Sequence, residues 1–173
     1  MSRVHVIGEG EEVAARLYPG AEIVRLEDAF PKEPMQAVVV FSVLQRGTYA
    51  AAMGMLQGIA DRLEEGGEAH VFVPSLDWAA RQMMKAQPSP ATEFIIYGPQ
   101  YSGEVYQSGW TIIALRSYMH RCGFIVTAAS RVEDEWVLKA PNGDTQVEPV
   151  ELNYVKGVRH GTDSGRPVSG DSP

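Results

Sequence analysis

The chain has 173 residues, of which 45% are hydrophobic and 21% are charged. This length is typical of one domain that buries its own core. The composition excludes a chain disordered throughout, a collagen-like repeat and a disulfide-stabilised scaffold. The net charge of −7, from 22 acidic and 15 basic residues, argues against nucleic acid as a partner, because binding to a phosphate backbone needs a basic surface.

The sequence also indicates a cellular compartment. A single cysteine, Cys122, cannot form an internal disulfide, which favours a reducing environment. The first residues lack the apolar region of a secretory signal, and no apolar run reaches the ~18 residues that a membrane span needs. We therefore expect a cytoplasmic protein that does not engage a membrane. Cys122 ends an apolar helical pattern, so we expect a packed thiol there rather than a nucleophile.

Strands and helices alternate in the first part of the chain. Residues 4–7 form a short strand pattern, and residues 11–18 have an apolar helical face. A second strand is predicted over 21–26. The continuous apolar run at 37–41 is typical of a strand buried on both faces in the middle of a parallel sheet.

The alternation continues toward the C-terminus. Apolar spacing predicts three helices, over 49–64, 76–86 and 111–121, and two strands, over 69–73 and 124–128. The stretch between residues 88 and 103 is rich in proline and glycine, so we expect it to be irregular.

A hairpin is predicted to end the folded region. Residues 136–139 and 147–155 form two strand patterns, joined around the turn signal Asn142-Gly143 into an antiparallel hairpin. The chain then becomes polar and rich in glycine, serine and proline. We predict one α/β domain over residues 1–158 and a polar, flexible tail over 159–173.

The strand–helix alternation predicts a three-layer, Rossmann-like α/β fold. Its sheet is mostly parallel, is flanked by helices on both faces and ends in the antiparallel hairpin. In such sheets a ligand binds at the carboxyl ends of the strands, near the switch point. Four segments fall at such ends: Gly8–Gly10, Glu27–Asp28, Ser42–Leu44 and Pro74–Asp77.

The usual signatures of metal and hydrolase sites are absent from the sequence. The four histidines share no metal-ligand spacing and have no cysteine partners, so we expect no metal site. His5 and His70 lie in parallel-strand patterns and are expected to be internal. Ser42 lacks the Gly-x-Ser-x-Gly elbow of α/β-hydrolases.

Three segments resemble the class I S-adenosylmethionine-dependent methyltransferase fold. Residues 4–12, VHVIGEGEE, are similar to its opening strand and glycine-rich loop. Residues 37–44, the following helix and residues 63–74 resemble its fourth strand, helix, Gly-Gly turn and fifth strand. Residues 108–124 resemble its late helix and sixth strand. The resemblance covers roughly residues 4–128, and the order of the segments is more specific than any one of them.

The resemblance implies a cofactor site for S-adenosylmethionine. The cofactor would lie over Gly8, Glu9 and Gly10, near Ser42. If residues 21–26 are the family's second strand, Glu27 is the ribose-binding acid. If they are its third strand, Asp28 belongs to the adenine-side motif.

An acceptor site is implied as well. In the family, the region after the fifth strand covers the acceptor pocket. Residues 94–110 occupy that region here and are unusually aromatic. We expect four of them to contact the acceptor: Tyr97, Gln100, Tyr106 and Trp110.

The sequence departs from the family's pattern in three places. Glu12 stands where the loop normally has its third glycine, and Gln36 replaces the acid before the central strand. Only about ten residues, 27–36, separate the second strand from the central one, so one βα unit is missing.

Two functions are therefore open. The first is a small methyltransferase that uses S-adenosylmethionine on a small-molecule or protein acceptor, which the sequence does not identify. The second is a catalytically inactive methyltransferase-fold protein that acts in assembly or partner binding. A homodimer could then cover the side that the missing unit leaves open.

Overall fold

The structure, a computed structural model, describes residues 2–26, 30–85, 89–97, 106–139 and 145–160. The strands are β1 (Arg3–Gly8), β2 (Glu22–Arg25), β3 (Met35–Phe41), β4 (Leu63–Pro74), β5 (Phe124–Lys139) and β6 (Thr145–Arg159). The helices are α1 (Glu11–Leu17), α2 (Tyr49–Arg62), α3 (Leu76–Met83), α4 (Pro90–Tyr97) and α5 (Ile112–Arg121), with a 3-10 turn, η1, at Leu44–Arg46.

All six strands form one mixed sheet in the order β2-β1-β3-β4-β6-β5. β1, β2, β3 and β4 run parallel to one another, and β6 lies antiparallel between β4 and β5. This arrangement confirms the predicted α/β fold, in which a mostly parallel sheet carries an antiparallel C-terminal hairpin.

The position of β2 decides between the two alternatives for residues 21–26. β2 pairs directly with β1, with Arg3 opposite Glu22. In doubly wound sheets of strand order 3-2-1-4-5-6 the second strand lies beside the first, and the third lies outside it. Residues 21–26 therefore occupy the second-strand position. Within the described residues no strand pairs with the outer side of β2, so the unit that the fold lacks is the third one.

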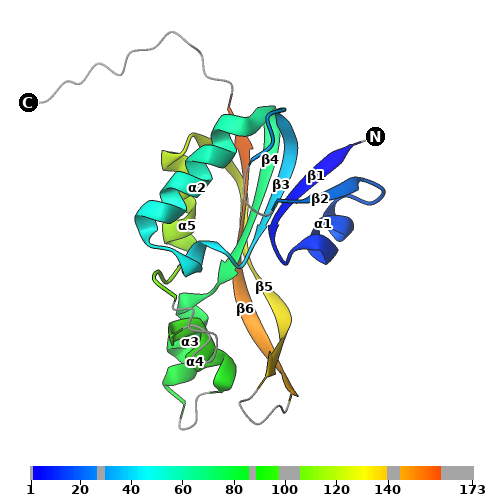
Figure 1. The fold of residues 1–173 in the computed structure, drawn as a ribbon. Coiled ribbons are helices and arrows are strands. Elements are labelled where there is room, and N and C mark those ends of the chain that lie inside the picture. The colour runs from blue at the N-terminus through cyan, green and yellow to red at the C-terminus, as the bar shows by residue number, and fades with distance from the viewer. Residues whose placement is uncertain (1, 27–29, 86–88, 98–105, 140–144, 161–173) are drawn as a thin grey trace, which may run out of the picture.

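Helices cover both faces of the sheet, with α1 on one side and α2 and α5 on the other (Figure 1). The larger core lies under α2 and α5. There, helix residues such as Leu56 and Leu115 pack against Val38, Val40 and Val71 of the central strands. Burial of each such side chain contributes about 1.5–3 kcal/mol. Val38 and Val40 face this core, whereas Ala37 and Val39 face a second core on the other side of the sheet, which explains why residues 37–41 are apolar without interruption.

Side-chain caps fix where three helices begin. The hydroxyls of Thr48, Ser75 and Thr111 accept hydrogen bonds from Ala51 N, Trp78 N and Ala114 N at the starts of α2, α3 and α5. Each cap satisfies a backbone donor that the helix leaves unpaired.

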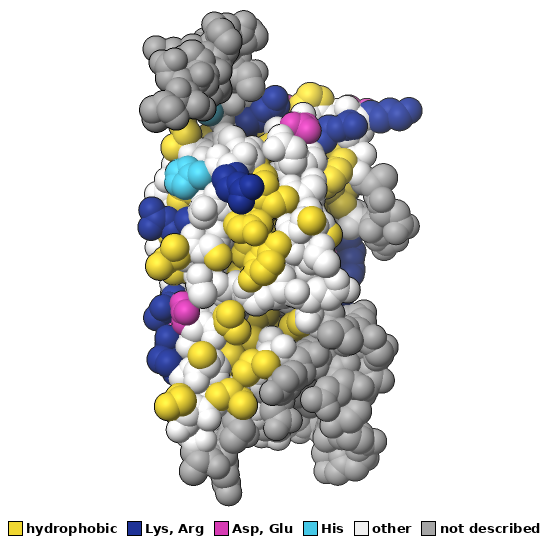
Figure 2. Space-filling view, turned by 90° about the vertical axis from the view of Figure 1, so that its left-hand side faces the viewer, with side chains coloured by type: hydrophobic (Ala, Val, Ile, Leu, Met, Phe, Trp, Pro, Cys, Tyr) yellow, Lys and Arg dark blue, Asp and Glu magenta, His cyan; other side chains and the backbone are white. Residues whose placement is uncertain are grey.

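Figure 2 looks onto the α2–α5 side, where hydrophobic side chains gather in separate patches. The exposed apolar residues of these helices include Tyr49 and Ile113.

A second core lies on the α1 face and extends to the hairpin. Ala79 of α3 and Ile95 of α4 pack in the same cluster as Val150 and Leu152 of β6. The two small helices are thereby joined to the β5–β6 hairpin, which projects beyond the other strands (Figure 1).

The prediction of an irregular segment over 88–103 was wrong for residues 90–97, which form α4. Pro90 is the first helical residue, a position where the missing N–H of proline costs nothing. The next donor, Ala91 N, is bound by the carboxylate of Glu148 on β6, at 3.0 Å. This long-range cap cannot be recognised from local sequence.

The separate strands predicted at 124–128 and 136–139 are one strand, β5. The polar residues between the two predicted strands belong to the sheet because β5 pairs with β6 from Phe124 to Lys139. Their polarity follows from their position at the sheet edge. The hairpin itself is confirmed.

Cys122 is buried, as expected, and its Sγ lies 3.8 Å from the Met53 carbonyl oxygen. Burial raises the pKa of this thiol, which keeps it protonated.

None of the described helices has the length and apolar character that crossing a membrane would require. β6 ends at Arg159, and residues 161–173 lie outside the described part of the chain, so the tail stays a prediction.

Candidate functional site

The glycine loop lies at the carboxyl end of β1, as predicted. Gly8 has a φ of 89°, which only glycine adopts at no steric cost. A Cβ on Gly8 would overlap the Phe41 carbonyl oxygen and lie 2.6 Å from Val43 Cγ2. A Cβ on Gly10 would lie 2.8 Å from Phe41 Cβ. The end of β3 therefore fills the space beside this loop, and both glycines are needed for that close approach.

The three glutamates around the loop have different environments. Glu9 is exposed in the loop itself. Glu11 forms an ion pair with Arg25 of β2, with 3.2 Å between its Oε1 and Nη1 of the arginine. Glu12, the residue at the third glycine position, is exposed in the first turn of α1. Of the three, Glu9 is the one within the glycine loop.

Ser42 follows β3 with a φ of 53°, the positive-φ conformation that non-glycine residues rarely adopt. Such a backbone costs on the order of 1–3 kcal/mol and persists where its surroundings enforce it. Here Ser42 N donates to the Phe72 carbonyl of β4 at 2.9 Å, and Ser42 Oγ accepts from Gln45 Nε2 at 2.8 Å. The strained residue lies at the carboxyl end of β3, beside β1, where a ligand is expected.

Gln45 of η1 is a candidate that the sequence analysis missed. Its side chain is 2% exposed, and its Oε1 has no hydrogen-bond partner. An unpaired buried amide oxygen costs about 1–3 kcal/mol, so it is a natural acceptor for a ligand donor. No sequence pattern singles it out, because its burial depends on the tertiary fold.

The last residues of the expected acceptor region are bound to this turn. Gln107 N donates to the Gln45 carbonyl at 2.9 Å, and Ser108 Oγ donates to the Gly47 carbonyl at 2.9 Å. Ser108 Oγ also accepts from Trp110 Nε1 at 3.0 Å. Residues 107–110 are therefore fixed against the end of β3.

The four residues expected to contact the acceptor occupy different surroundings. Trp110 is fully buried, with its ring against Tyr49 and Tyr118. Tyr106 packs edge-on against Phe94 of α4. Tyr97 ends α4, but its side chain lies outside the described residues, as does all of Gln100. The structure gives Trp110 a packing role, and the contacts of all four with an acceptor stay predictions.

Glu27 and Asp28 also lie outside the described residues. The residue before them, Leu26, donates its N–H to the Val6 carbonyl at 2.8 Å. The chain therefore leaves β2 at the carboxyl edge, on the side of the glycine loop.

These residues agree in part with what S-adenosylmethionine needs. The loop from Gly8 to Gly10 offers backbone groups with one exposed carboxylate, and that charge suits a cationic sulfonium. Gln45 Oε1 is an unpaired acceptor, and Nε2 of the same side chain donates a hydrogen bond to Ser42 Oγ. The ribose and adenine contacts would come from Glu27 and Asp28.

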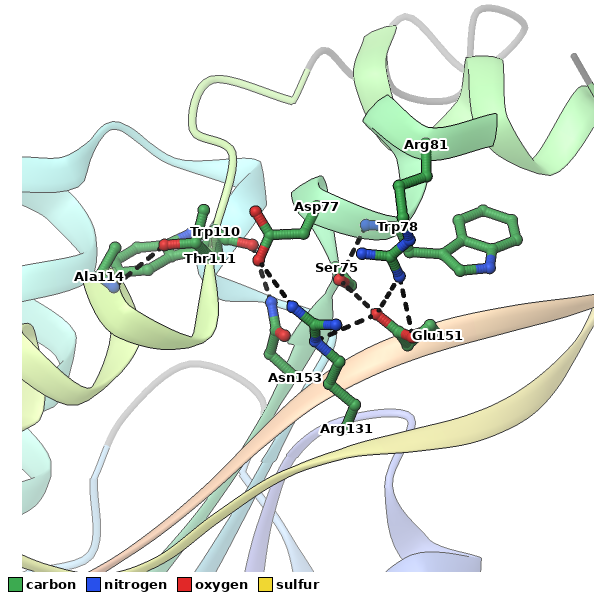
Figure 3. A network of polar contacts seen from close by, with 10 residues as sticks. All are labelled: Ser75, Asp77, Trp78, Arg81, Trp110, Thr111, Ala114, Arg131, Glu151 and Asn153. Atoms are coloured by element: carbon green, nitrogen blue, oxygen red, sulfur yellow. Dashed lines mark hydrogen bonds and ion pairs between the residues drawn. The ribbon is translucent and has the colours of Figure 1, made fainter. Parts of the chain in front are cut away.

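A separate polar cluster lies at the carboxyl end of β4, where the sequence placed a ligand segment at Pro74–Asp77 (Figure 3). Glu151 of β6 accepts hydrogen bonds from Ser75 Oγ at 2.9 Å and from Arg81 at 3.0 Å, and it lies 3.4 Å from Nε of Arg131. Arg131 also pairs with Asp77 at 3.3 Å. In this cluster Ser75 and Asp77 bind α3 to the hairpin.

Asn153, at the base of the same cluster, is fully buried. Its Nδ2 donates to the Trp110 carbonyl at 2.8 Å, and its Oδ1 has no partner. Beyond the cluster, α3 and the hairpin enclose a hollow of about 530 Å³, lined by Trp78, Gln82, Lys85, Glu133 and Glu148 among others. The carboxylate of Glu148 is bound to α4 and is 5% exposed.

A second polar network lies on the α1 face of the sheet, around His70. Tyr18 donates its phenolic proton to Glu68 Oε2 at 2.6 Å and lies 2.8 Å from His70 Nε2. A phenol has one proton, so His70 Nε2–H must donate to the Tyr18 oxygen. His70 Nδ1 then accepts from the Tyr154 hydroxyl at 2.9 Å, and Lys156 Nζ lies 2.5 Å from Glu68 Oε1. Every polar group in this network is paired.

The network shifts the pKa values of its members. Burial lowers the pKa of His70, which is therefore neutral. Burial would raise the pKa of Glu68, but hydrogen bonds from Lys156, Tyr18 and His70 outweigh it and hold the pKa at about 2. Burial and the neighbouring carboxylate raise the pKa of Tyr18. The expectation that His70 is internal is confirmed. His5 is buried too, with its Nδ1 unpaired and its pKa lowered by burial.

Across the described residues, no group of His, Cys, Asp and Glu side chains is placed to hold a metal ion. No family model matches the sequence, and no curated protein matches it.

Solved structures do match the fold. A candidate methyltransferase from Bacillus halodurans C-125 has a TM-score of 0.56 and 11% identity, with 92% of each chain covered. A chain in the complex between the Haloferax volcanii Trm112 methyltransferase activator and a candidate methyltransferase has a TM-score of 0.62 and 13% identity, covering 95% of this chain and 84% of that one. The S-adenosylmethionine-dependent methyltransferase SibL has a TM-score of 0.55 and 15% identity, covering 92% of this chain and 50% of its own.

At these identities the likeness shows the fold alone. The strand order, the glycine loop after β1 and the antiparallel β6 agree with it. The protein thus has the class I methyltransferase-like fold, and the residues that the structure describes contain no third βα unit.

Proposed function

We propose that the protein binds S-adenosylmethionine at the carboxyl ends of β1, β2 and β3 and acts as a small methyltransferase in the cytoplasm. Its acceptor would be a small molecule or a protein. The observation that carries the proposal is the strained backbone of Ser42 beside the Gly8 turn. Strain of this kind is concentrated at ligand sites, where function maintains a conformation that stability alone does not favour.

The residues that would hold the cofactor are Gly8, Glu9, Gly10 and Ser42, with Glu27 and Asp28 following the resemblance. The cofactor would supply an electrophilic methyl group on a cationic sulfonium. Methyl transfer is an in-line displacement, so the protein's task is to align acceptor and donor. A lone nucleophile or base is therefore not required. Among similar structures, SibL is an S-adenosylmethionine-dependent methyltransferase and PigF was solved with S-adenosylhomocysteine.

The inactive alternative is favoured by a specific observation of its own. Gly8 and Gly10 are both required by the approach of β3, so the loop would keep its glycines even without a cofactor. The absent third unit also removes one wall of the cofactor cleft. A similar structure was solved in a complex with a methyltransferase activator, which supports a protein partner under this alternative.

Calorimetric titration separates the two functions. We expect S-adenosylmethionine and S-adenosylhomocysteine to bind one-to-one with micromolar affinity. Glu9→Lys should weaken S-adenosylmethionine by about tenfold, or ~1.4 kcal/mol, and S-adenosylhomocysteine by less, because only the former carries a sulfonium. Glu27→Ala should weaken both.

Glu65→Lys is the matched control. Glu65 is also exposed, lies at the amino-terminal end of β4 and undergoes the same change of charge, so it should leave both affinities unchanged. A folded protein that gives no heat with millimolar ligand would refute the proposal and leave the inactive alternative. Equal losses in both lysine variants would show that Glu9 does not contact the cofactor.

A further inference from the structure

β5 is a long, open edge of the sheet. It spans 16 residues, and no strand pairs with its outer side in the described ranges. Five consecutive residues, Thr127 to Arg131, are exposed. Because successive side chains of a strand point to opposite faces, this stretch is open on both faces as well as along its edge.

Natural proteins usually make such edges short, charged or bulged, because an open edge pairs with other chains. β5 has a bulge between Val126 and Ala128 and an acidic run from Glu133 to Glu135. Between these features lie Ala128, Ala129 and Ser130, which are small and uncharged. The regular part of the edge therefore remains available for pairing.

We propose that β5 pairs antiparallel with β5 of a second copy of the chain, about a two-fold axis through Val132. The two sheets then join edge to edge. This inference is independent of the proposed cofactor site, which lies on the other half of the sheet.

The charges of β5 restrict the register and favour this one. In a two-fold antiparallel pair, directly opposed residues share a face, so the axis passes through one residue of each strand. An axis at 131 would oppose two copies of Arg131, and an axis at 133 or 134 would oppose two carboxylates. An axis at Val132 places Arg131 opposite Glu133 twice and opposes no like charges.

The same register gives nearly the greatest possible overlap. Val132 lies at the middle of β5, so the regular stretch beyond the bulge, residues 128–136 of one copy, faces residues 136–128 of the other. On the second face, Ser130 lies opposite Asp134 and Ala128 opposite Trp136. Small residues thus face large or charged ones along the regular stretch.

The ion pairs within one chain are compatible with the dimer. Arg131 binds Glu151 and Asp77 and keeps 44% of its side chain exposed. A guanidinium has five N–H donors, so it can bind Glu133 of the second copy as well.

Disulfide trapping tests the register directly. Cys122 is buried, so a cysteine introduced at the half-buried position 132 would be the thiol available for trapping. Opposed Cα atoms in an antiparallel pair are about 4.5–5.5 Å apart, within the range that a disulfide spans. Under oxidised glutathione we expect Val132→Cys to form a covalent dimer in high yield.

Ser130→Cys is the matched control, because its copy would lie opposite residue 134, about 13 Å along the strand. It should form at least tenfold less covalent dimer. Equal trapping of the two variants, or trapping of neither, would overturn the register.

Charge changes at one position test the interface without a disulfide. Ser130→Asp places like charges opposite Asp134 twice and should weaken dimerisation in sedimentation equilibrium by about tenfold. Ser130→Lys should strengthen it by a similar factor. Ala15→Asp and Ala15→Lys, on exposed α1, change the net charge equally and should have no effect. A wild-type chain that stays monomeric at tens of micromolar, or a dimer indifferent to residue 130, would refute the proposal.

Discussion

The loop at the ends of β1 and β3 differs from the network around His70 in backbone strain and in the pairing of its buried polar atoms. Ser42 has a strained backbone, and Gln45 beside it keeps a buried, unpaired oxygen. Around His70, by contrast, both ring nitrogens and the Glu68 carboxylate have partners. A sequence specifies its fold well when backbone conformation, packing and hydrogen bonding all favour the same structure, and proteins depart from this agreement mainly at functional sites. The difference supports the first region as the ligand site and the second as a structural element.

The largest effect on the free energy of unfolding is expected when a side chain is added to the glycine loop. Gly8→Ala combines a positive φ with overlap of the Phe41 carbonyl, so we expect a loss of about 3 kcal/mol or more in the free energy of unfolding. Gly20→Ala is the control, because Gly20 has a φ of 79° with nothing within 4 Å. It should cost about 1 kcal/mol. Denaturant unfolding of both variants measures the overlap by difference. Equal losses would show that β3 does not restrict the loop.

Removing one hydroxyl from the His70 network should have the next largest effect. Tyr18→Phe removes the hydroxyl that donates to Glu68 Oε2 and accepts from His70 Nε2–H, which leaves His70 Nε2 with only the longer 3.4 Å contact to Glu68 Oε2. Leaving buried groups unpaired costs about 1–3 kcal/mol. Tyr49→Phe removes a hydroxyl that donates to the Gly109 carbonyl at an exposed position, and it should cost less than about 1 kcal/mol. If the two variants lose equal stability, the network is not the stabilising element that we infer.

Acid should destabilise the fold in two separate pH ranges, first through the buried histidines and then through Glu68. The folded pKa values of His70 and His5 are lowered, so the unfolded chain binds more protons once the pH falls below about 6.5. Stability is then complete above that pH and falls as the pH drops toward the folded pKa values. Glu68, with a pKa of about 2, loses its contribution only below the unfolded carboxyl pKa, as the pH falls toward 2.

Unfolding titrations from pH 8 to pH 3 measure this dependence. His70→Gln should flatten the slope between pH 6.5 and 5, whereas His120→Gln, at an exposed residue of α5, should leave it unchanged. An unchanged slope in His70→Gln would contradict burial of a neutral imidazole.

The smallest effect is expected at Ser42. Ser42→Gly relieves the positive φ but loses the hydroxyl that accepts from Gln45 and adds freedom to the unfolded chain. We expect a net gain of about 0.5 kcal/mol in stability and weaker binding of S-adenosylmethionine. A gain in stability without any change in binding would separate the strain from the cofactor site.

The sequence was sufficient to predict the elements whose pattern is local. The apolar run at 37–41 predicts β3, the glycine after β1 predicts the loop, and the Asn142-Gly143 signal predicts the antiparallel pairing of β5 with β6. The continuity of β5 and the existence of α4 depend on partners in β6, such as Glu148, and β6 lies far along the chain. Long-range pairing of this kind overrides local preference.

The candidate site was predictable to a similar degree. Gly8 and Ser42 lie where strand order alone placed them. Phe41 and Gln45, which fill or border the same place, were not singled out, because their roles arise from the approach of β3 to the loop. Trp110 has the residue type of a binding surface, yet its burial between α2 and α5 depends on tertiary packing.

The insertion of β6 between β4 and β5 has a consequence for synthesis on the ribosome. β4 has six consecutive buried residues, from Ala69 to Pro74, yet its second neighbour is the last strand to be made. Until residues 152–158 leave the ribosome, the apolar edge of β4 has no partner, and such edges promote aggregation. Chains that terminate before Thr145 would keep that edge permanently, so they should be substrates for chaperones and proteases.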